Sequence, residues 1–189
     1  MTQWLTQSGL SVTATGPDNH FVAVAGSASA VSSAFGASLA DYLVNGKQAP
    51  HRRDQYRHFH PITTRWMDND AYGHVNNVVY YSWFDTVVNA YLVQTGVLDI
   101  EASPVIGLVV ETHCNYFGPL AFPQTVIAAL RVAHIGTSSV RYEIGLFAAD
   151  ADEASAQGHF VHVYVDRTSR RAVPIGDPLR AILEQIRVA

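Results

Sequence analysis

A ten-residue stretch of this chain carries side chains that could perform hydrolysis. The stretch "DNDAYGHVNN" spans residues 68–77 and contains Asp70, His74, Asn76 and Asn77. A carboxylate can activate a water molecule as a general base, or it can attack a carbonyl carbon directly. We therefore take this polar stretch as the first candidate for a reaction centre.

Several members of the stretch also have a purely structural interpretation. Asp70 could be a turn residue only, since aspartate is common in turns. Asp68 is expected to be structural, and Gly73 suits a turn position with a positive φ angle. His74 is expected to hydrogen-bond across the loop rather than to catalyse. The polar loop alone therefore leaves a turn and a reaction centre as alternatives.

A long apolar helix is expected directly after the loop, over residues 77–94. Asn76 or Asn77 can cap it, because an asparagine side chain accepts from the free amides of a first helical turn. Binding a substrate is the open alternative for both. The helix is apolar on nearly every side, which predicts that it is buried all round. Tyr80 is expected to be a core residue first and a pocket residue second.

After this helix the hydrophobic period changes from helical to two, which predicts strands. The predicted strands span 57–67 before the helix and 104–117, 124–136, 138–150 and 154–166 after it, and a last helix is capped by Asp177. One buried helix followed by an antiparallel meander predicts an α+β fold in which the sheet curls around the helix.

Strict alternation along 104–117 would place Leu108 and Cys114 on one face of the sheet and Gly107, Glu111 and His113 on the other. Glu111 and His113 could then form an acid–base pair. Such a pair is more often a solvated or interface contact, so a structural interpretation remains beside the chemical one.

The first part of the chain differs from the rest in composition. Residues 1–50 are rich in Ala, Ser, Gly and Thr, and we predict a flexible or loosely docked extension there, followed by one folded domain over 51–189. Residues 38–44 are expected to form a short helix. The extension lacks the positive n-region of a secretory signal, and its many Ser and Gly residues make it a poor membrane span.

Composition excludes several classes of function. The formal net charge is −4 and no basic stripe is present, which argues against a nucleic-acid partner. Cys114 is the single cysteine, so an internal disulfide is excluded and a reducing, cytoplasmic compartment is expected. The nine histidines show no convincing ligand spacing, and we predict no metal site. Neither a Gly-x-Ser-x-Gly motif nor a phosphate-binding glycine loop is present.

The segment "RWMDNDAYGHVNNVVYYSWFD", residues 65–85, resembles the signature loop and helix of the hot-dog acyl-CoA thioesterases. The similarity is closest to the group that contains 4-hydroxybenzoyl-CoA thioesterase. The segment "IGLVVETHCNYFGPLAFPQTV", residues 106–126, also looks like the second strand of that family and its following turn. The resemblance covers roughly residues 57–165, and it implies a hot-dog fold with an antiparallel sheet wrapped around the central helix.

The resemblance also implies an activity, the hydrolysis of acyl-CoA thioesters to the free acid and coenzyme A. It places the catalytic carboxylate on Asp70, as base or nucleophile, and the backbone amide that binds the oxyanion on Gly107. The Asn76–Asn77 pair stands where the hydroxybenzoyl enzyme has an aromatic residue, so it is more similar to a fatty-acyl or general branch. The site residues expected to contact substrate are His74, Asn76, Asn77, Tyr80 and Arg141.

The resemblance implies no cofactor, because coenzyme A is part of the substrate. Since the sites of this family lie between subunits, a homodimer or a homotetramer is expected. Arg131, Arg141 and the Arg167–Arg171 cluster are candidates for the coenzyme A phosphates. Two other functions stay open: a hot-dog module that binds acyl-CoA or a partner protein without turnover, and a hydratase-like enzyme, although the motif of such hydratases is not found.

Overall fold

The computed structural model describes residues 6–15, 22–25, 43–44 and 47–188. The chain divides into two compact units, Met1–Ala49 and Pro50–Ala189. In the first unit, β1 (Ser11–Thr15) pairs with β2 (Val22–Ala25), and β3 (Leu43–Val44) pairs with β4 (Lys47–Gln48). The short helix expected over 38–44 falls mostly outside the described residues, and its last two positions belong to β3. The loose docking of this extension stays a prediction.

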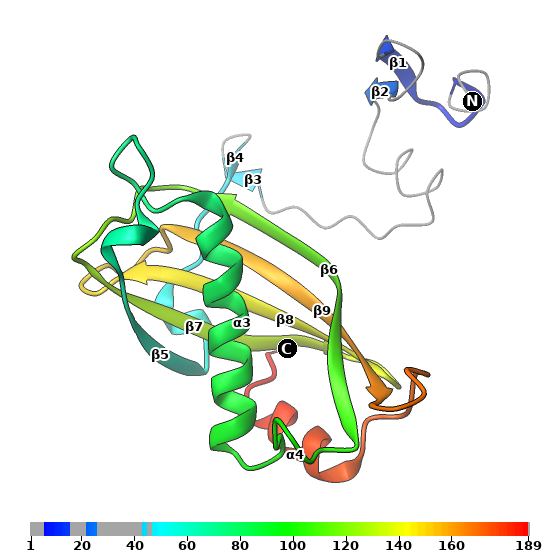
Figure 1. The fold of residues 1–189 in the computed structure, drawn as a ribbon. Helices are drawn as coiled ribbons and strands as arrows, with labels where there is room; N and C mark the ends of the chain where they lie inside the picture. The colour runs from blue at the N-terminus through cyan, green and yellow to red at the C-terminus, as the bar shows by residue number, and fades with distance from the viewer. Residues whose placement is uncertain (1–5, 16–21, 26–42, 45–46, 189) are drawn as a thin grey trace. The chain divides into compact units, whose positions relative to one another are not determined.

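The second unit is built on one five-stranded antiparallel sheet (Figure 1). In spatial order its strands are β5 (His58–Thr63), β7 (Thr125–Ile135), β8 (Ser139–Ala148), β9 (Ala156–Asp166) and β6 (Val105–Tyr116). The predicted antiparallel strands are confirmed, but only β7, β8 and β9 form a meander, because β6 pairs with β9 rather than with β7. The strand that precedes the helix lies at one edge of the sheet, and the first strand after it lies at the other. β6 pairs only with β9 among the described strands.

Helix α3 (Asn77–Gln94) lies across one face of this sheet, over the residues predicted for it (Figure 1). The side of the helix that faces the sheet carries three fully buried side chains, Phe84, Val87 and Val88. Each contributes about 2 kcal/mol of hydrophobic stabilisation. The helix is not buried all round, however, because a sheet of one chain covers only one side of it. Val78 is 64% exposed, and Asp85 is also on the open side.

A β-bulge interrupts β6 between Val109 and Glu111. A bulge adds one residue to a strand, so the side chains after it change faces. Gly107, before the bulge, therefore faces the helix side, whereas Glu111, after it, faces away from the helix. The prediction that these two share a face is wrong, because it assumed unbroken alternation.

The remaining elements close the ends of the unit. Two short 3₁₀ helices, η2 (Arg53–Gln55) and η3 (Trp66–Asp68), flank β5, and α4 (Asp177–Gln185) follows β9. Gly176 rather than Asp177 is the N-cap of α4. Within the described part of the chain, no helix combines the length and the apolar character that a membrane span requires.

Candidate active site

The polar loop before α3 is anchored by Asp68. This carboxylate is only 1% exposed and accepts from the Arg65 backbone amide at 2.7 Å and from the Arg65 guanidinium at 2.7 and 3.0 Å. The Asp68 carbonyl oxygen also accepts from the Asn76 amide at 2.8 Å. Asp68 therefore joins the two ends of the loop and sets where the residues between them lie.

Asp70 lies half-buried in this loop. Its Oδ1 accepts from the backbone amides of Tyr72 at 2.8 Å and His74 at 3.4 Å, while its own amide donates to the His74 carbonyl at 2.7 Å. Gly73 closes the turn with φ +82°, as predicted. Asp70 Oδ2 accepts no hydrogen bond from any residue that the structure describes. The side chain thus organises a turn with one oxygen and leaves the other oxygen for chemistry.

Asp70 opens onto a shallow cavity of about 400 Å³. Its walls come from the polar loop, the start of α3 and the end of β6, and comprise Asp70, His74, Val75, Asn77, Tyr80, Tyr116, Phe117, Gly118 and Pro119. Tyr80 is buried and contacts Tyr116 edge to face at 5.0 Å, and burial raises the pKa of Tyr80. Four of the seven predicted site residues therefore share one cavity: Asp70, His74, Asn77 and Tyr80.

The two asparagines have different positions at the start of α3. Asn76 is the N-cap, since its Oδ1 accepts from the Val78 amide at 3.2 Å and its carbonyl oxygen accepts from the Val79 amide at 2.9 Å. This leaves the Asn77 N–H as the first-turn amide beside the Asp70 cavity. From the sequence, only the side chain of Asn77 was expected to act. A first-turn amide next to a cap is, however, a standard donor for anions.

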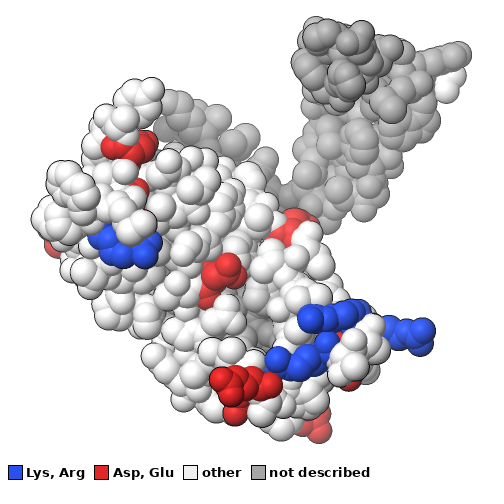
Figure 2. All heavy atoms as spheres, viewed as in Figure 1, with Lys and Arg blue, Asp and Glu red and all other residues white. Residues whose placement is uncertain are grey.

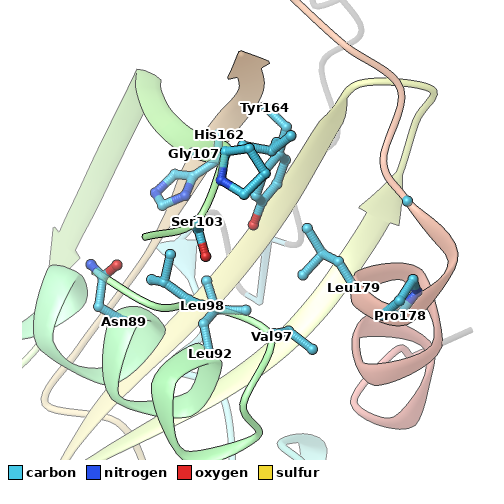
Figure 3. A pocket seen from close by; sticks show the side chains of 13 residues that line it. Asn89, Leu92, Val97, Leu98, Ser103, Gly107, His162, Tyr164, Pro178 and Leu179 are labelled. Atoms are coloured by element: carbon cyan, nitrogen blue, oxygen red, sulfur yellow. The ribbon is translucent and has the colours of Figure 1, made fainter. Parts of the chain in front are cut away.

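Gly107 lies at the other end of β6 from this cavity. It is separated from Tyr116 by about nine positions, roughly 30 Å of extended strand. It lines a second and deeper cavity of about 320 Å³, which is bounded by α3, the start of β6 and the start of α4 (Figure 3). Within one chain, the structure does not bring Gly107 and Asp70 together.

His162 of β9 faces the second cavity beside Gly107 and Tyr164 (Figure 3). It is 3% exposed, and neither ring nitrogen has a hydrogen-bond partner among the described residues. Burial lowers the pKa of His162 to about 4, so the ring is neutral at pH 7. The sequence did not single out this residue for a role in a site, because one histidine on the apolar face of a strand is usually a core residue.

Arg141 lies on the face of the sheet that points away from α3. Its Nη2 donates to His159 Nδ1 at 2.9 Å, and His159 Nε2–H donates to Glu111 Oε1 at 2.7 Å. Glu111 thus bonds to His159 rather than to His113, which instead bonds to Asn115 at 3.0 Å. Arg141 is therefore separated from both cavities by the sheet.

The basic residues after β9 lie close to the mouth of the second cavity. Arg167 donates to the carbonyl oxygen of Ser103 at 2.6 Å, and Ser103 is one of the residues that line that cavity. Arg170 and Arg171 follow in the same turn. Figure 2 shows basic side chains gathered at this end of the molecule.

No cluster of three potential metal ligands occurs among the described residues.

Comparisons with known proteins identify the family of the folded unit. The model of a family described as the thioesterase-like superfamily matches residues 64–183, and a model described as the pro-kumamolisin activation domain matches residues 1–58. The second match covers less than a third of the chain and supports no assignment of the whole. No curated protein matches the chain.

Solved structures similar to this chain include two proteins from Pseudomonas aeruginosa. The PA5185 protein is 55% identical with a TM-score of 0.72, and the match covers 75% of this chain and 98% of that chain. The PA2801 protein, a proposed thioesterase, is 31% identical with a TM-score of 0.63, covering 67% of this chain and 97% of that one.

A third solved structure shares the fold at low identity. It is Slr0204 from Synechocystis, a 1,4-dihydroxy-2-naphthoyl-CoA thioesterase, with 14% identity and a TM-score of 0.60. The match covers 66% of this chain and 93% of that chain. The hot-dog fold that the sequence predicted is therefore confirmed.

Proposed function

The chain belongs to the thioesterase-like superfamily and is a thioester hydrolase, and on this basis we propose that it hydrolyses acyl-CoA thioesters to the free acid and coenzyme A. The observation that carries the proposal is the position of Asp70. Its carboxylate lies in a cavity at the amino end of the buried helix, with one oxygen held by backbone amides and the other free of partners among the described residues.

In the proposed reaction, Asp70 acts on the thioester carbonyl carbon, either by activating water or by direct attack. A thiolate is a good leaving group, so the second requirement is a donor for the oxygen that becomes negative. The Asn77 amide is such a donor in the same chain, because it lies beside Asp70 where the helix dipole also favours negative charge. Asn76 supports this donor by capping the helix.

We propose that Gly107 takes part from a second copy of the chain. The free edge of β6 carries Leu108, Val109 and Val110, which are 38, 43 and 60% exposed. An apolar, unpaired strand edge favours pairing with another strand. An antiparallel pair of β6 strands with its two-fold axis near Glu111 would place Gly107 of one copy opposite Tyr116 of the other. A homodimer of this kind, or a homotetramer of two such dimers, unites the two cavities.

The basic residues around Arg167 support coenzyme A binding near the mouth of the Gly107 cavity, since guanidinium groups suit phosphate. Arg141 could serve this purpose only at the opposite face of the sheet, and we assign it to the pairing with His159 and Glu111 instead.

The proposed reaction requires no metal and no redox cofactor. The free thiol of Cys114, whose pKa burial raises to about 11, suits a reducing compartment such as the cytoplasm.

The direct test is a panel of short, medium, long and aryl acyl-CoA esters with detection of the released thiol. Asp70→Asn should lower kcat by about a thousandfold, since general bases and nucleophiles contribute on this scale, and it should leave the melting temperature nearly unchanged. Asp152→Asn, at an exposed turn, is the matched control and should keep full activity. Tight binding of esters without thiol release by the unmodified protein would instead support a non-catalytic binding module.

A further inference from the structure

We infer that His162 is a specificity residue that selects acyl groups with a hydroxyl or other neutral hydrogen-bonding oxygen on the first few carbons after the thioester. This inference rests on the proposed function. It concerns the cavity of about 320 Å³ next to Gly107, which has the size of a pocket for a small ligand. A long unbranched acyl chain exceeds this space, whereas a short acyl group fits within it.

Most of the walls of this cavity are apolar. These walls come from α3, the loop after it, the start of β6 and α4, and comprise Leu92, Val97, Leu98, Val105 and Leu179 (Figure 3). Such a lining accepts the carbon chain of an acyl group by the hydrophobic effect. A polar group among these side chains therefore needs a separate explanation.

His162 is the group that needs this explanation, because Asn89 and Ser103, which also line the cavity, have hydrogen-bond partners. A neutral imidazole carries one N–H donor and one acceptor nitrogen, and in this protein both lack partners among the described residues although the side chain is nearly fully buried. Buried polar groups without hydrogen bonds reduce the stability of a protein. Phe160 occupies the equivalent position two residues earlier on the same strand face, so an apolar ring would suit the packing at position 162.

The other polar group deep in the cavity does not satisfy His162. The Tyr164 hydroxyl is bonded to the Tyr142 hydroxyl at 2.6 Å. Tyr142 contacts the His162 ring edge to face at 5.1 Å, through its aromatic ring rather than through its hydroxyl. The imidazole is thus held in place by aromatic contacts while its hydrogen-bonding capacity remains available to a ligand.

The position of His162 relative to Gly107 sets where on the acyl group it acts. A Cβ atom added at Gly107 would approach His162 Nδ1 to 2.9 Å, so the imidazole lies directly against the Gly107 backbone. With the thioester carbonyl near Gly107, His162 meets the first few carbons of the acyl chain rather than its far end. A hydroxyl at the third carbon can then donate to one ring nitrogen or accept from the other.

The test compares two esters of nearly equal shape, 3-hydroxyhexanoyl-CoA and 3-methylhexanoyl-CoA, which differ by a hydroxyl in place of a methyl group. The unmodified protein should hydrolyse the hydroxylated ester with a kcat/KM about tenfold or more higher, because only this ester satisfies the imidazole. His162→Phe should remove or reverse this preference, and His162→Gln, which keeps a donor and an acceptor, should retain part of it. His159→Gln, on the opposite face of the same strand, is the control and should leave the ratio unchanged.

A preference that persists in His162→Phe, or an unmodified protein that prefers the methyl ester, would overturn the inference while leaving the proposed hydrolysis intact. Absence of thiol release from every ester would instead count against the proposed function. In that case, isothermal titration of the same two esters decides the question for His162. Tighter binding of the hydroxylated ester that His162→Phe abolishes supports the inference, and equal affinities overturn it.

Discussion

The two cavities of the folded unit differ in depth and in the hydrogen bonding of their key side chains. The Asp70 cavity is shallow, and its carboxylate is held by backbone amides of the loop that it closes. The His162 cavity is deeper and mainly apolar, and its buried imidazole has no partner among the described residues. One cavity can hold a charge, and the other can enclose a short apolar group that carries one polar atom.

This difference bears on how one reaction can use both places. Charged chemistry requires donors and access to water, whereas acyl binding requires a dry and enclosed lining. The two cavities lie at opposite ends of β6, roughly 30 Å apart along the strand, so a single chain cannot apply both to one thioester. Antiparallel pairing of two β6 edges is the simplest arrangement that unites them.

Separating the two copies of the proposed dimer should have the largest effect on activity. A lysine in place of Val110, the exposed residue at the bulge of β6, would put a charge into the proposed strand pair. Val110→Lys should dissociate the dimer in sedimentation velocity and lower kcat/KM by about a hundredfold, since each monomer would keep the Asp70 cavity without its partner cavity.

Val93→Lys provides a matched control, because Val93 is also an exposed valine but lies on α3. It should remain dimeric and active. A Val110→Lys protein that is monomeric and as active as the unmodified protein would show that one chain carries a complete site.

The His162 cavity should also be detectable in the pH dependence of stability. Its folded-state pKa of about 4 lies below the ordinary value of 6.5, so the unfolded chain takes up a proton first as the pH falls. The unfolding free energy should therefore decrease between pH 6.5 and pH 4, and His162 should account for about 3 kcal/mol of this loss.

Urea unfolding at pH 7.5 and pH 4.5 measures this contribution when the unmodified protein is compared with His162→Phe. Burial also lowers the pKa of His51, His58 and His159, and both proteins share those contributions. The decrease should be smaller in His162→Phe. Equal decreases would mean that the imidazole is not held in a dry environment.

At the Asp70 cavity a smaller effect is expected from the helix cap. Asn76→Ala removes the side-chain acceptor for the Val78 amide and should lower the unfolding free energy by about 1 kcal/mol. Asn89→Ala, in the middle of the same helix, should cause no such loss, because alanine has the higher helix propensity. A larger loss for Asn89→Ala than for Asn76→Ala would contradict the assigned cap.

The helix and the strands themselves could be predicted because their signals are local. The apolar run after Asn76 and the change of period near Pro104 predict α3 and the antiparallel strands that follow it, and the structure confirms both. The pairing of β6 with β9 instead of β7 is set by tertiary packing and has no local signal. The faces of β6 could not be predicted in the same way. One additional residue at the bulge moves Gly107 and Glu111 to opposite faces, and no signal in the local sequence marks that insertion.

The candidate site was predictable only in part. Asp70, His74 and Tyr80 share a cavity because the loop that carries the first two leads directly into the start of α3. The pairing of Glu111 with His159 links different strands and depends on register. His162 has ordinary alternation in β9, so only its burial without hydrogen bonds distinguishes it from a core residue.

Subunit complementation tests most directly whether the site is shared between two copies. Asp70→Asn removes the carboxylate, and Gly107→Val fills the space against His162 in the other cavity; each variant alone should form dimers that are inactive. Mixed dimers should contain one complete site, so an equimolar co-expression should regain about a quarter of the unmodified activity. Mixed dimers that form, as shown by a tag on one variant, but regain no activity would contradict a site built from two copies.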